Sequence, residues 1–439
     1  MIESILLALG LSIFIVFLNK KNSKIFLGFL QGKKYNILEY LEYINNSKEK
    51  IYKMKKDNKD INSTLVMTKR ATRLYRFNLI FNFFISFIFI FLINRYVFSR
   101  EGNIGKYIIL ILIYVIYYVS FDKYQEYIFY ISASIMKPFE DAINKSFFNE
   151  AKEKMKTLDD LKVIGIAGSF GKTSTKFITS TILKEKFNVL ETPESYNTTM
   201  GVSKIINDEL NDSYDIFITE LGARSIEEIE VLTDLLQPDI GVITSIGPVH
   251  LETFKNIDNI MKTKFELIED LPTKGVAVFN YDNEYIKKLA DKTFKEKINY
   301  GIENSENLDI FAEDIIISHE GSEFTLKDKN NNSIKCRTKL LGKHNISNIL
   351  AGASIALSLG LSLEEIKTGI SKIEPIDHRL NVKKIKNNIT VIDDSYNSNP
   401  IGAKAALDVI SHFKEGKKII VTPGMINLGM MELDANFEF

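Results

Sequence analysis

The sequence predicts a doubly wound α/β domain that follows an N-terminal membrane region. Beyond residue 160, short apolar runs alternate with amphipathic stretches, which is the pattern of parallel strands joined by helices. Before residue 122, three apolar stretches are long enough to be transmembrane helices. At the start of the α/β domain, a glycine-rich turn separates a predicted strand from a predicted helix, and this layout is typical of a phosphate-binding loop.

The predicted phosphate-binding loop begins after the apolar run Val163–Ala167. It contains Gly168 and then Gly171-Lys172-Thr173, and a helical pattern follows through Leu183. In such a loop, backbone N–H groups face the anion, the lysine reaches the terminal phosphates and the hydroxyl binds Mg²⁺. The strict pattern has a glycine five positions before Gly171, whereas here the glycine lies three positions before it. The flanking strand and helix still favour a phosphate site.

Length and composition limit the possible architectures. A chain of 439 residues predicts two or three domains. Its 56 basic and 56 acidic residues balance, so composition gives no indication of a nucleic-acid partner. The only cysteine, Cys336, excludes an intrachain disulfide framework and a cysteine-based zinc site.

Residues 1–122 are predicted to be a membrane region, with spans at about 2–18, 77–97 and 104–121. The only early charge is Glu3, which favours a retained anchor over a signal peptide. The intervening loop, 19–76, is strongly basic, and its 15 Lys/Arg against 5 Asp/Glu place it in the cytoplasm. Everything after residue 122 is then cytoplasmic in a multi-pass membrane protein. Contact of this loop with membrane lipid and simple solvation both remain open.

The remaining pattern predicts a connector at 123–160, interrupted by Pro138, and then the elements of the α/β domain. Strands are expected at 215–220, 240–245 and 275–280, helices at 225–236, 257–271 and 349–359, and a small antiparallel insertion at 308–341. A capping box of Ser225 and Glu228 would start the first of these helices. Because ligands bind beyond the carboxyl ends of parallel strands, Glu220 and His250 should lie on the rim of the phosphate loop. Glu220 suits Mg²⁺, whereas spacing alone makes His250 a capping or packing residue.

Seven ordered motifs carry a resemblance to a known family. The chain resembles the Mur ligases, the ATP-dependent amide ligases of peptidoglycan assembly, and its last motif is similar to that of the MurF branch, which joins D-alanyl-D-alanine to UDP-N-acetylmuramoyl-tripeptide. The resemblance implies a central ATP-binding domain at 161–376 and part of a C-terminal Rossmann-like domain at 377–439. The motifs are Ala167–Thr175, Thr219–Ala223, Gly247–Glu252, Lys262–Lys264, Gly342–Asn348, His378–Leu380 and Asp393–Pro400.

The resemblance also implies a mechanism, in which ATP phosphorylates a carboxylate and an amine attacks the resulting acyl phosphate. It assigns catalytic roles to Lys172, His250 and Lys264, with Lys264 carbamylated by CO₂. It assigns Mg²⁺ to Thr173, Glu220, His250 and Lys264. The implied ATP-binding residues are Gly168, Ser169, Gly171, Lys172, Thr173, Ser174, His344, Asn345, Asn348 and Arg379. The implied substrate-binding residues are Asn197, Thr198, Asp393, Tyr396 and Asn397.

Two features depart from the family. The usual N-terminal domain that binds the UDP of the substrate is not visible. A lipid-linked peptidoglycan precursor is therefore an alternative to the small-molecule precursor as the substrate. D-Ala-D-Ala is a candidate amine donor. Only sixty residues follow Arg379, so we expect a poorly stabilised, truncated C-terminal domain, although Val421–Gly429 begins a family-like strand and turn. The sequence also leaves open a poly-γ-glutamate ligase and a non-catalytic ATP-binding membrane protein.

Overall fold

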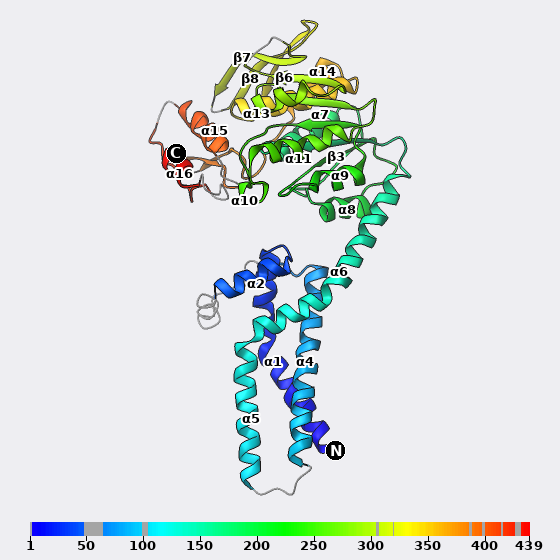
Figure 1. Cartoon of the computed structure of the whole chain (residues 1–439). Coiled ribbons are helices and arrows are strands. Elements are labelled where there is room, and N and C mark those ends of the chain that lie inside the picture. Colours follow the sequence, from blue (N-terminus) through cyan, green and yellow to red (C-terminus); the bar gives the residue numbers. More distant parts are fainter. Residues whose placement is uncertain are drawn as a thin grey trace. The chain divides into compact units, whose positions relative to one another are not determined.

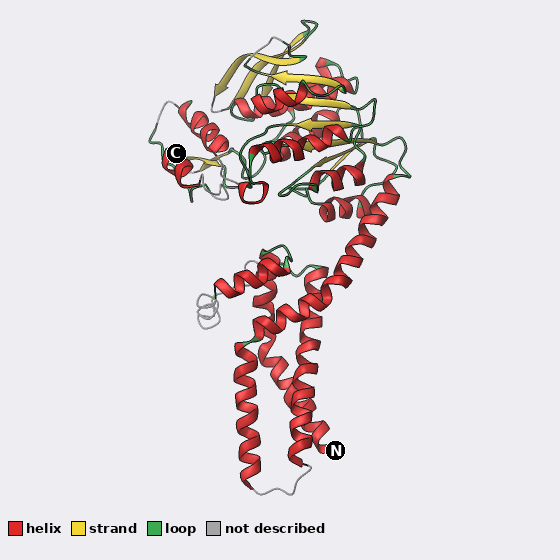
Figure 2. Ribbon diagram, in the orientation of Figure 1, coloured by secondary structure: helices red, strands yellow, loops and turns green. Residues whose placement is uncertain are grey.

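The computed structural model describes residues 2–47, 65–98, 104–303, 307–318, 320–385, 389–396, 400–413, 416–425 and 432–439. They form two compact units, Met1–Lys145 and Ser146–Phe439. The first unit consists of helices, whereas the second contains the strands (Figures 1 and 2). The predicted domain boundaries at residues 122, 160 and 376 remain predictions.

The first unit contains two helices that are long and apolar enough to cross a membrane, Ile2–Gly32 and Lys69–Tyr96. A third span results if the pair Ile108–Lys123 and Gln125–Met155, bent by 66°, is counted as one. The first two predicted spans therefore coincide with such helices, and the third does so only as part of the bent pair. The helices of this unit are α1 (Ile2–Gly32), α2 (Ile37–Asn46), α4 (Lys69–Phe98), α5 (Ile104–Lys123) and the first two thirds of α6 (Gln125–Met155).

The described part of the predicted basic loop 19–76 is largely helical, and its role as the cytoplasmic connection between two spans stays a prediction. Helix α1 continues to Gly32, and α2 begins after Asn36, whose side-chain oxygen accepts hydrogen bonds from two backbone amides of the first turn. Lysines and arginines are good helix formers, and their charges are compatible with exposed helical faces. A run of charge therefore does not by itself indicate a loop.

Buried polar side chains recur between the helices of this unit beside its buried apolar clusters, and many large apolar side chains are exposed. Asn78, Asn82, Ser86 and Asn94 recur along one face of α4 and are fully buried. Asn78 donates a hydrogen bond of 2.8 Å to Ser132 of α6, while large apolar residues such as Phe84, Ile88 and Ile111 are exposed. Small and polar residues between helices, with apolar residues facing outward, are typical of packing within a bilayer.

Helix α6 is continuous through Pro138, so the predicted interruption of the connector was wrong. A proline removes one backbone hydrogen bond and bends a helix, but the neighbouring turns can hold it together. Here the next turn carries Glu140, which is almost fully buried and accepts two hydrogen bonds of 2.7 and 2.6 Å from the guanidinium of Arg73. This ion pair fixes α6 against α4 beside the proline.

The second unit is built on one nine-stranded sheet in the order β2-β3-β1-β4-β5-β6-β7-β8-β9. Strands β2 to β7 pair in parallel, and β7, β8 and β9 pair antiparallel. The predicted doubly wound α/β fold is confirmed, and β1 lies where the strand order reverses, at which ligands bind in such sheets. The strands are Lys162–Ala167, Val189–Glu191, Ile216–Glu220, Ile240–Ile243, Val276–Asn280, Glu296–Gly301, Ile310–Ser318, Gly321–Asp328 and Ser333–Thr338.

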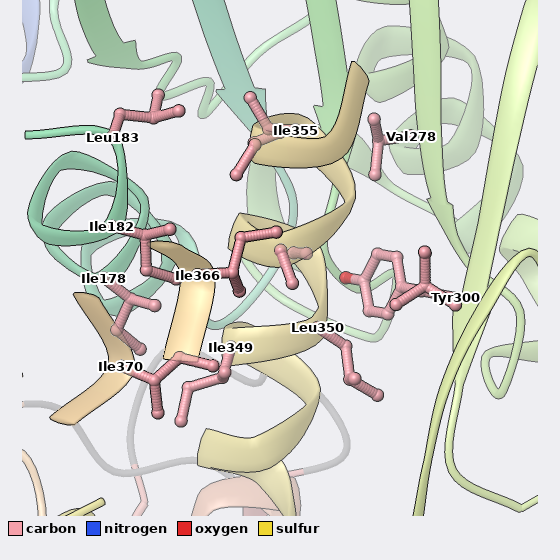
Figure 3. Close-up of a cluster of buried hydrophobic side chains, with 14 of the residues drawn as sticks. Ile178, Ile182, Leu183, Val278, Tyr300, Ile349, Leu350, Ile355, Ile366 and Ile370 are labelled. Atoms are coloured by element: carbon pink, nitrogen blue, oxygen red, sulfur yellow. The ribbon is translucent and has the colours of Figure 1, made fainter. Parts of the chain in front are cut away.

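Helices cover both faces of the sheet, because neighbouring residues of each buried strand point to opposite faces. Thus Ile164 and Ile166 join the core beneath α7, α13 and α14, whereas Val163 and Ala167 join the core on the other face. Figure 3 shows the first core, with side chains of these three helices clustered beside Val278. The helices are α7 (Lys172–Leu183), α13 (Lys343–Ser358) and α14 (Leu363–Ser371) on one face, and α8 (Thr199–Asp208), α9 (Glu228–Leu236), α11 (Ile257–Glu269) and α12 (Glu284–Ala290) on the other.

The core of Figure 3 gives a stability prediction. Leu350 of α13 is fully buried, so Leu350→Ala is expected to lower the free energy of unfolding by about 2–5 kcal/mol through lost burial and a cavity. Ile316 of β7 is exposed, and Ile316→Ala should change it by less than about 0.5 kcal/mol. Denaturant unfolding of both variants measures the difference. Equal effects of the two substitutions would contradict this description of the core.

Three local predictions need correction. Helix α9 begins at Glu228, not Ser225, and the Glu228 carboxylate accepts a hydrogen bond of 2.6 Å from the Arg224 amide, so the predicted capping box is absent there. The antiparallel segment 308–341 is no separate insertion, because β7 pairs with β6 and extends the main sheet. Helix α13 begins at Lys343, six residues before its predicted start.

The residues after Arg379 form a small substructure. It contains the hairpin of β10 (Asn381–Ile385) and β11 (Ile389–Asp393), α15 (Pro400–Ser411) and α16 (Glu432–Glu438). Its buried apolar side chains are few, and two of them, Leu380 and Val409, cluster with Leu341, which precedes α13. The strand expected from Val421 is absent from the described residues 416–425, and Val421 itself is exposed.

Candidate nucleotide and substrate site

The phosphate loop joins β1 to α7 and depends on two glycines with positive φ. Gly168 has φ 152°, and a Cβ atom there would collide with the Thr244 hydroxyl. Gly171 has φ 81°, and a Cβ atom there would lie 2.8 Å from the Asn348 amide oxygen. Both positions thus need glycine for backbone conformation and for space.

The end of β4 holds the loop in place. The Ser169 amide donates to the Ser245 carbonyl at 2.7 Å, and the Phe170 amide donates to the Ser245 hydroxyl at 2.8 Å. The Ser169 hydroxyl donates to the Gly247 carbonyl at 3.0 Å. Helix α7 then starts at Lys172, and the N–H groups of its first turn, which includes Ser174, have no intrahelical acceptor. A rigid loop that ends in such a turn suits a phosphate group.

The Lys172 ammonium folds back over this loop. Its Nζ atom donates to the Gly168 carbonyl at 2.7 Å and lies 3.4 Å from the Ser169 carbonyl. Burial lowers the pKa of Lys172, the Glu220 carboxylate raises it, and the Arg379 guanidinium lowers it further. The lysine is thus already positioned over the loop that would bind an anion.

A buried hydroxyl–carboxylate pair lies beside the loop. The Thr173 hydroxyl donates to Glu220 at 2.6 Å, and the Asn197 side-chain amide donates to the other carboxylate oxygen at 3.1 Å. Glu220 is fully buried at the end of β3, where its position at a strand terminus predicted it. Two hard oxygen donors in one place fit Mg²⁺, which uses few protein ligands and takes the rest from phosphate and water.

The other residues assigned to the metal are placed differently. No group of three His, Cys, Asp or Glu side chains that could hold a metal occurs among the residues that the structure describes. His250 precedes α10 (Leu251–Phe254) with φ 50°, and its side chain makes no capping hydrogen bond to that helix. Lys264 is 2% exposed on α11, with its ammonium 6.0 Å from the Phe254 ring centroid. Burial, followed by repulsion from Lys172, lowers the pKa of Lys264 to about 7.

Helix α13 meets the phosphate loop through Asn348. Its side-chain oxygen accepts a hydrogen bond of 3.2 Å from the Thr175 hydroxyl, and its amide nitrogen lies 3.4 Å from the Asn345 oxygen. Asn345 in turn donates to the Leu341 carbonyl at 2.9 Å. His344 precedes them, and burial lowers its pKa to about 4, so the imidazole is neutral at pH 7. The three assigned residues therefore share the first turns of one helix.

Two residues of the C-terminal segment contact the parts of the chain that surround Glu220. The Arg379 guanidinium donates to the Thr173 hydroxyl at 3.1 Å, and its carbon lies 4.3 Å from the Tyr396 ring centroid. The Tyr396 hydroxyl donates to the Ser195 hydroxyl at 2.6 Å. Arg379 thus contacts the first turn of α7, and Tyr396 contacts the segment between β2 and α8.

The remaining residues assigned to substrate lie elsewhere or outside the described residues. Asp393 bonds to residues of its own C-terminal segment, namely Ser395 and, at 2.9 and 3.2 Å, His378 and Lys383. The hydrogen bond from Ser395 is the main cause that lowers the pKa of Asp393. The Thr198 hydroxyl caps α8 by accepting from the Gly201 amide at 3.3 Å. Asn397 lies outside the described residues.

Sequence reasoning missed Lys176 and Ser195. Lys176 is fully buried one turn after Lys172, and a spacing of four residues on a helix places both on one face. That spacing could have identified Lys176. No local signal marks Ser195, whose partner lies 201 residues away.

A phosphate loop after the first of the central parallel strands, with a buried carboxylate at the end of the adjacent strand, defines a nucleotide-binding α/β domain of the P-loop type. Residues 166–356 match the Mur ligase middle domain family. This part of the chain is thus similar to a Mur ligase middle domain.

The chain is similar in sequence to MurF ligases. It is 37% identical over 268 residues to the UDP-N-acetylmuramoyl-tripeptide–D-alanyl-D-alanine ligase of Buchnera aphidicola, covering 61% of this chain and 57% of that protein. The Escherichia coli enzyme of the same name is 32% identical, covering 61% and 59%. The chain thus matches less than two thirds of the length of these relatives.

Solved structures of MurF ligases resemble the structure of this chain. MurF from Acinetobacter baumannii superposes with a TM-score of 0.62 at 28% identity, over 66% of this chain and 63% of that one. MurF ligase from Thermotoga maritima in complex with ADP also gives 0.62, at 25% identity over 67% of each chain. The fold of the second unit is accordingly MurF-like.

Proposed function

We propose that the chain is an ATP-dependent ligase that forms an amide bond on a peptidoglycan precursor, as MurF does. The observation that carries the proposal is the assembly of Lys172, Thr173 and Glu220 on the loop after β1, within a Mur ligase middle domain. The proposed catalytic unit comprises the domains 161–376 and 377–439.

The loop residues fit ATP with Mg²⁺. The backbone and side chains of Gly168, Ser169, Gly171, Lys172, Thr173 and Ser174 would hold the phosphates, and Thr173 and Glu220 the metal, with His250 and Lys264 nearby as further candidates. Bound ATP would supply the phosphoryl group that activates a substrate carboxylate. Arg379 and Lys172 place positive charge where negative charge develops during phosphoryl transfer, which stabilises the transition state. His344, Asn345 and Asn348 would face the base.

The loop between β2 and α8, with Asn197 and Thr198, would bind the acyl substrate, and Asp393, Tyr396 and Asn397 would approach from the C-terminal segment. By analogy with the named relatives, the substrates are a UDP-muramoyl-tripeptide and D-Ala-D-Ala. The contact of Tyr396 with Ser195 supports this placement, because it joins the two segments beside Glu220.

The helical unit favours a membrane location. Helices α1 and α4 would span a bacterial cell membrane, and the basic residues at the start of α4 would face the cytoplasm together with the ligase unit. The buried polar residues and exposed apolar residues of the helical unit also support a second candidate substrate, a lipid-linked precursor presented at the membrane surface. Contacts of Arg76 and neighbouring cations with anionic membrane lipid would assist both.

The test uses the full chain in detergent with ATP and Mg²⁺. Phosphate release should require both UDP-muramoyl-tripeptide and D-Ala-D-Ala, and removal of divalent metal with EDTA should abolish it. Release that occurs only with a lipid-linked acceptor would favour the second candidate. An absence of release with either acceptor would overturn the ligase proposal.

A further inference from the structure

The segment between β2 and α8, residues 192–198, is a loop without repetitive structure that borders the candidate site, and we call it the substrate-side loop. Two of its side chains reach the site. Asn197 donates to Glu220 at 3.1 Å, and Ser195 accepts from the Tyr396 hydroxyl at 2.6 Å. The position of this loop therefore decides whether both contacts form.

The other end of the loop is held by Lys176. The Lys176 ammonium donates to the Thr192 carbonyl, lies 3.4 Å from the Thr192 hydroxyl, and donates to the Glu194 carbonyl at 2.6 Å. It also lies 4.4 Å from the Phe177 ring centroid. A single side chain thus binds the backbone on both sides of Pro193.

The backbone at this point needs support. Glu194 has φ 43°, a left-handed conformation that is uncommon for a residue other than glycine. Such conformations persist only where surrounding interactions hold them, and they gather at ligand-binding sites. The hydrogen bond from Lys176 to the Glu194 carbonyl supplies one such interaction.

A fully buried ammonium is a costly way to fix a loop, which argues for a role beyond packing. Burial lowers the pKa of Lys176 to about 8. The carboxylates of Glu220, Glu191 and Glu194 raise this pKa, whereas the Arg379 guanidinium lowers it further. The ammonium is therefore the main form at pH 7 and retains three donors, matching its three oxygen neighbours.

Lys176 also connects the loop to the nucleotide side of the site. It follows Lys172 by four residues on α7, so both lysines lie on one face of the helix whose first turn borders the phosphate loop. Lys172 contacts the phosphate loop, whereas Lys176 contacts the substrate-side loop. Neither contact of Lys176 involves a group that would bind nucleotide.

We propose that Lys176 is a positioning residue that fixes the substrate-side loop, through Thr192 and Glu194, in the conformation that binds the acyl substrate. The proposal rests on the ligase function proposed above. Loss of this contact leaves the phosphate loop intact, releases Ser195 and Asn197 from their places, and weakens binding of the muramoyl-peptide much more than binding of nucleotide.

The test compares Lys176→Met with Lys184→Met in the full chain. Methionine keeps most of the apolar stem and removes the donors, and Lys184 offers a matched control because it is exposed, follows α7 and pairs with Glu191 beside the loop. Lys176→Met is expected to raise KM for UDP-muramoyl-tripeptide at least tenfold, with Kd for Mg-ATP within twofold of wild type. Amide hydrogen exchange at 192–198 should accelerate at least tenfold. Lys184→Met should leave all three values near wild type.

Parallel losses of nucleotide and peptide binding with a lowered Tm would show a merely structural role and overturn the proposal, as would an unchanged KM. If Lys176→Met does not fold, Ser195→Ala tests the loop from its other side, and an unchanged KM there would contradict the proposal. An inactive wild-type chain would overturn the ligase function instead. In that case, exchange at 192–198 in Lys176→Met still decides whether Lys176 fixes the loop.

Discussion

Lys172→Ala is expected to lower the rate of substrate-dependent phosphate release by about 10²–10³-fold, the range found when one preorganised charge-stabilising donor is removed. The reason is positional. The Lys172 ammonium already lies over the phosphate loop, 2.7 Å from the Gly168 carbonyl, so little reorganisation is needed to meet a phosphate. Steady-state phosphate release with saturating substrates measures the effect.

Lys162→Ala is the matched control for this experiment. Lys162 begins the strand that leads into the same loop, but its ammonium is exposed and pairs with Asp239 at 3.0 Å. Exposed ion pairs contribute about 0–1 kcal/mol, so this variant should keep the wild-type rate. Equal activity of Lys172→Ala and wild type would show that the loop does not act on phosphate.

The parts of the fold that sequence predicts are those specified by local patterns. The run Val163–Ala167 is apolar throughout because a central parallel strand is buried on both faces, and the loop that follows needs glycine at positions 168 and 171. Glu220 could be placed at the rim because it ends a strand of the same sheet. The apolar run, the two glycines and the strand end were sufficient to place the loop and Glu220, and nucleotide binding there stays a prediction.

The contacts of the C-terminal segment join residues far apart in the chain, which no local pattern encodes. Arg379 and Thr173 are 206 residues apart, and Tyr396 and Ser195 are 201 apart. Local motifs also mislead where a competing partner exists. Ser225 and Glu228 have the spacing of a capping box, but the Glu228 carboxylate binds the Arg224 amide instead, and the helix starts later.

Lys264 gives the second large effect, on the pH dependence of stability. The pKa of Lys264 is about 7 in the folded chain, against an ordinary value of 10.5. Between these two pH values the unfolded chain binds more protons at Lys264 than the folded chain does. The free energy of unfolding therefore rises with pH from about 7 to about 10.5. Below pH 7 the lysine is charged in the folded chain, so the full cost of burying the charge applies there. Lys264→Met is therefore expected to be more stable than wild type at pH 6 by roughly 2–4 kcal/mol, with the advantage shrinking as pH rises.

Denaturant unfolding at pH 6, 7.5 and 9 measures this difference in stability, with Lys262→Met as the control because Lys262 is exposed on the same helix.

The low pKa of Lys264 also leaves about half or more of its amine neutral at pH 7 and above. The neutral amine is the form that adds CO₂ to give a carbamate and a proton. Activity should accordingly increase with bicarbonate between pH 6 and 8 in wild type and Lys262→Met, and Lys264→Met should be inactive at every pH. If Lys264→Met showed the same pH slope of stability as Lys262→Met, the ammonium of Lys264 would not be the buried charge described here. A stabilised but inactive Lys264→Met would instead mean that this lysine is retained, at a cost to the fold, for its chemistry.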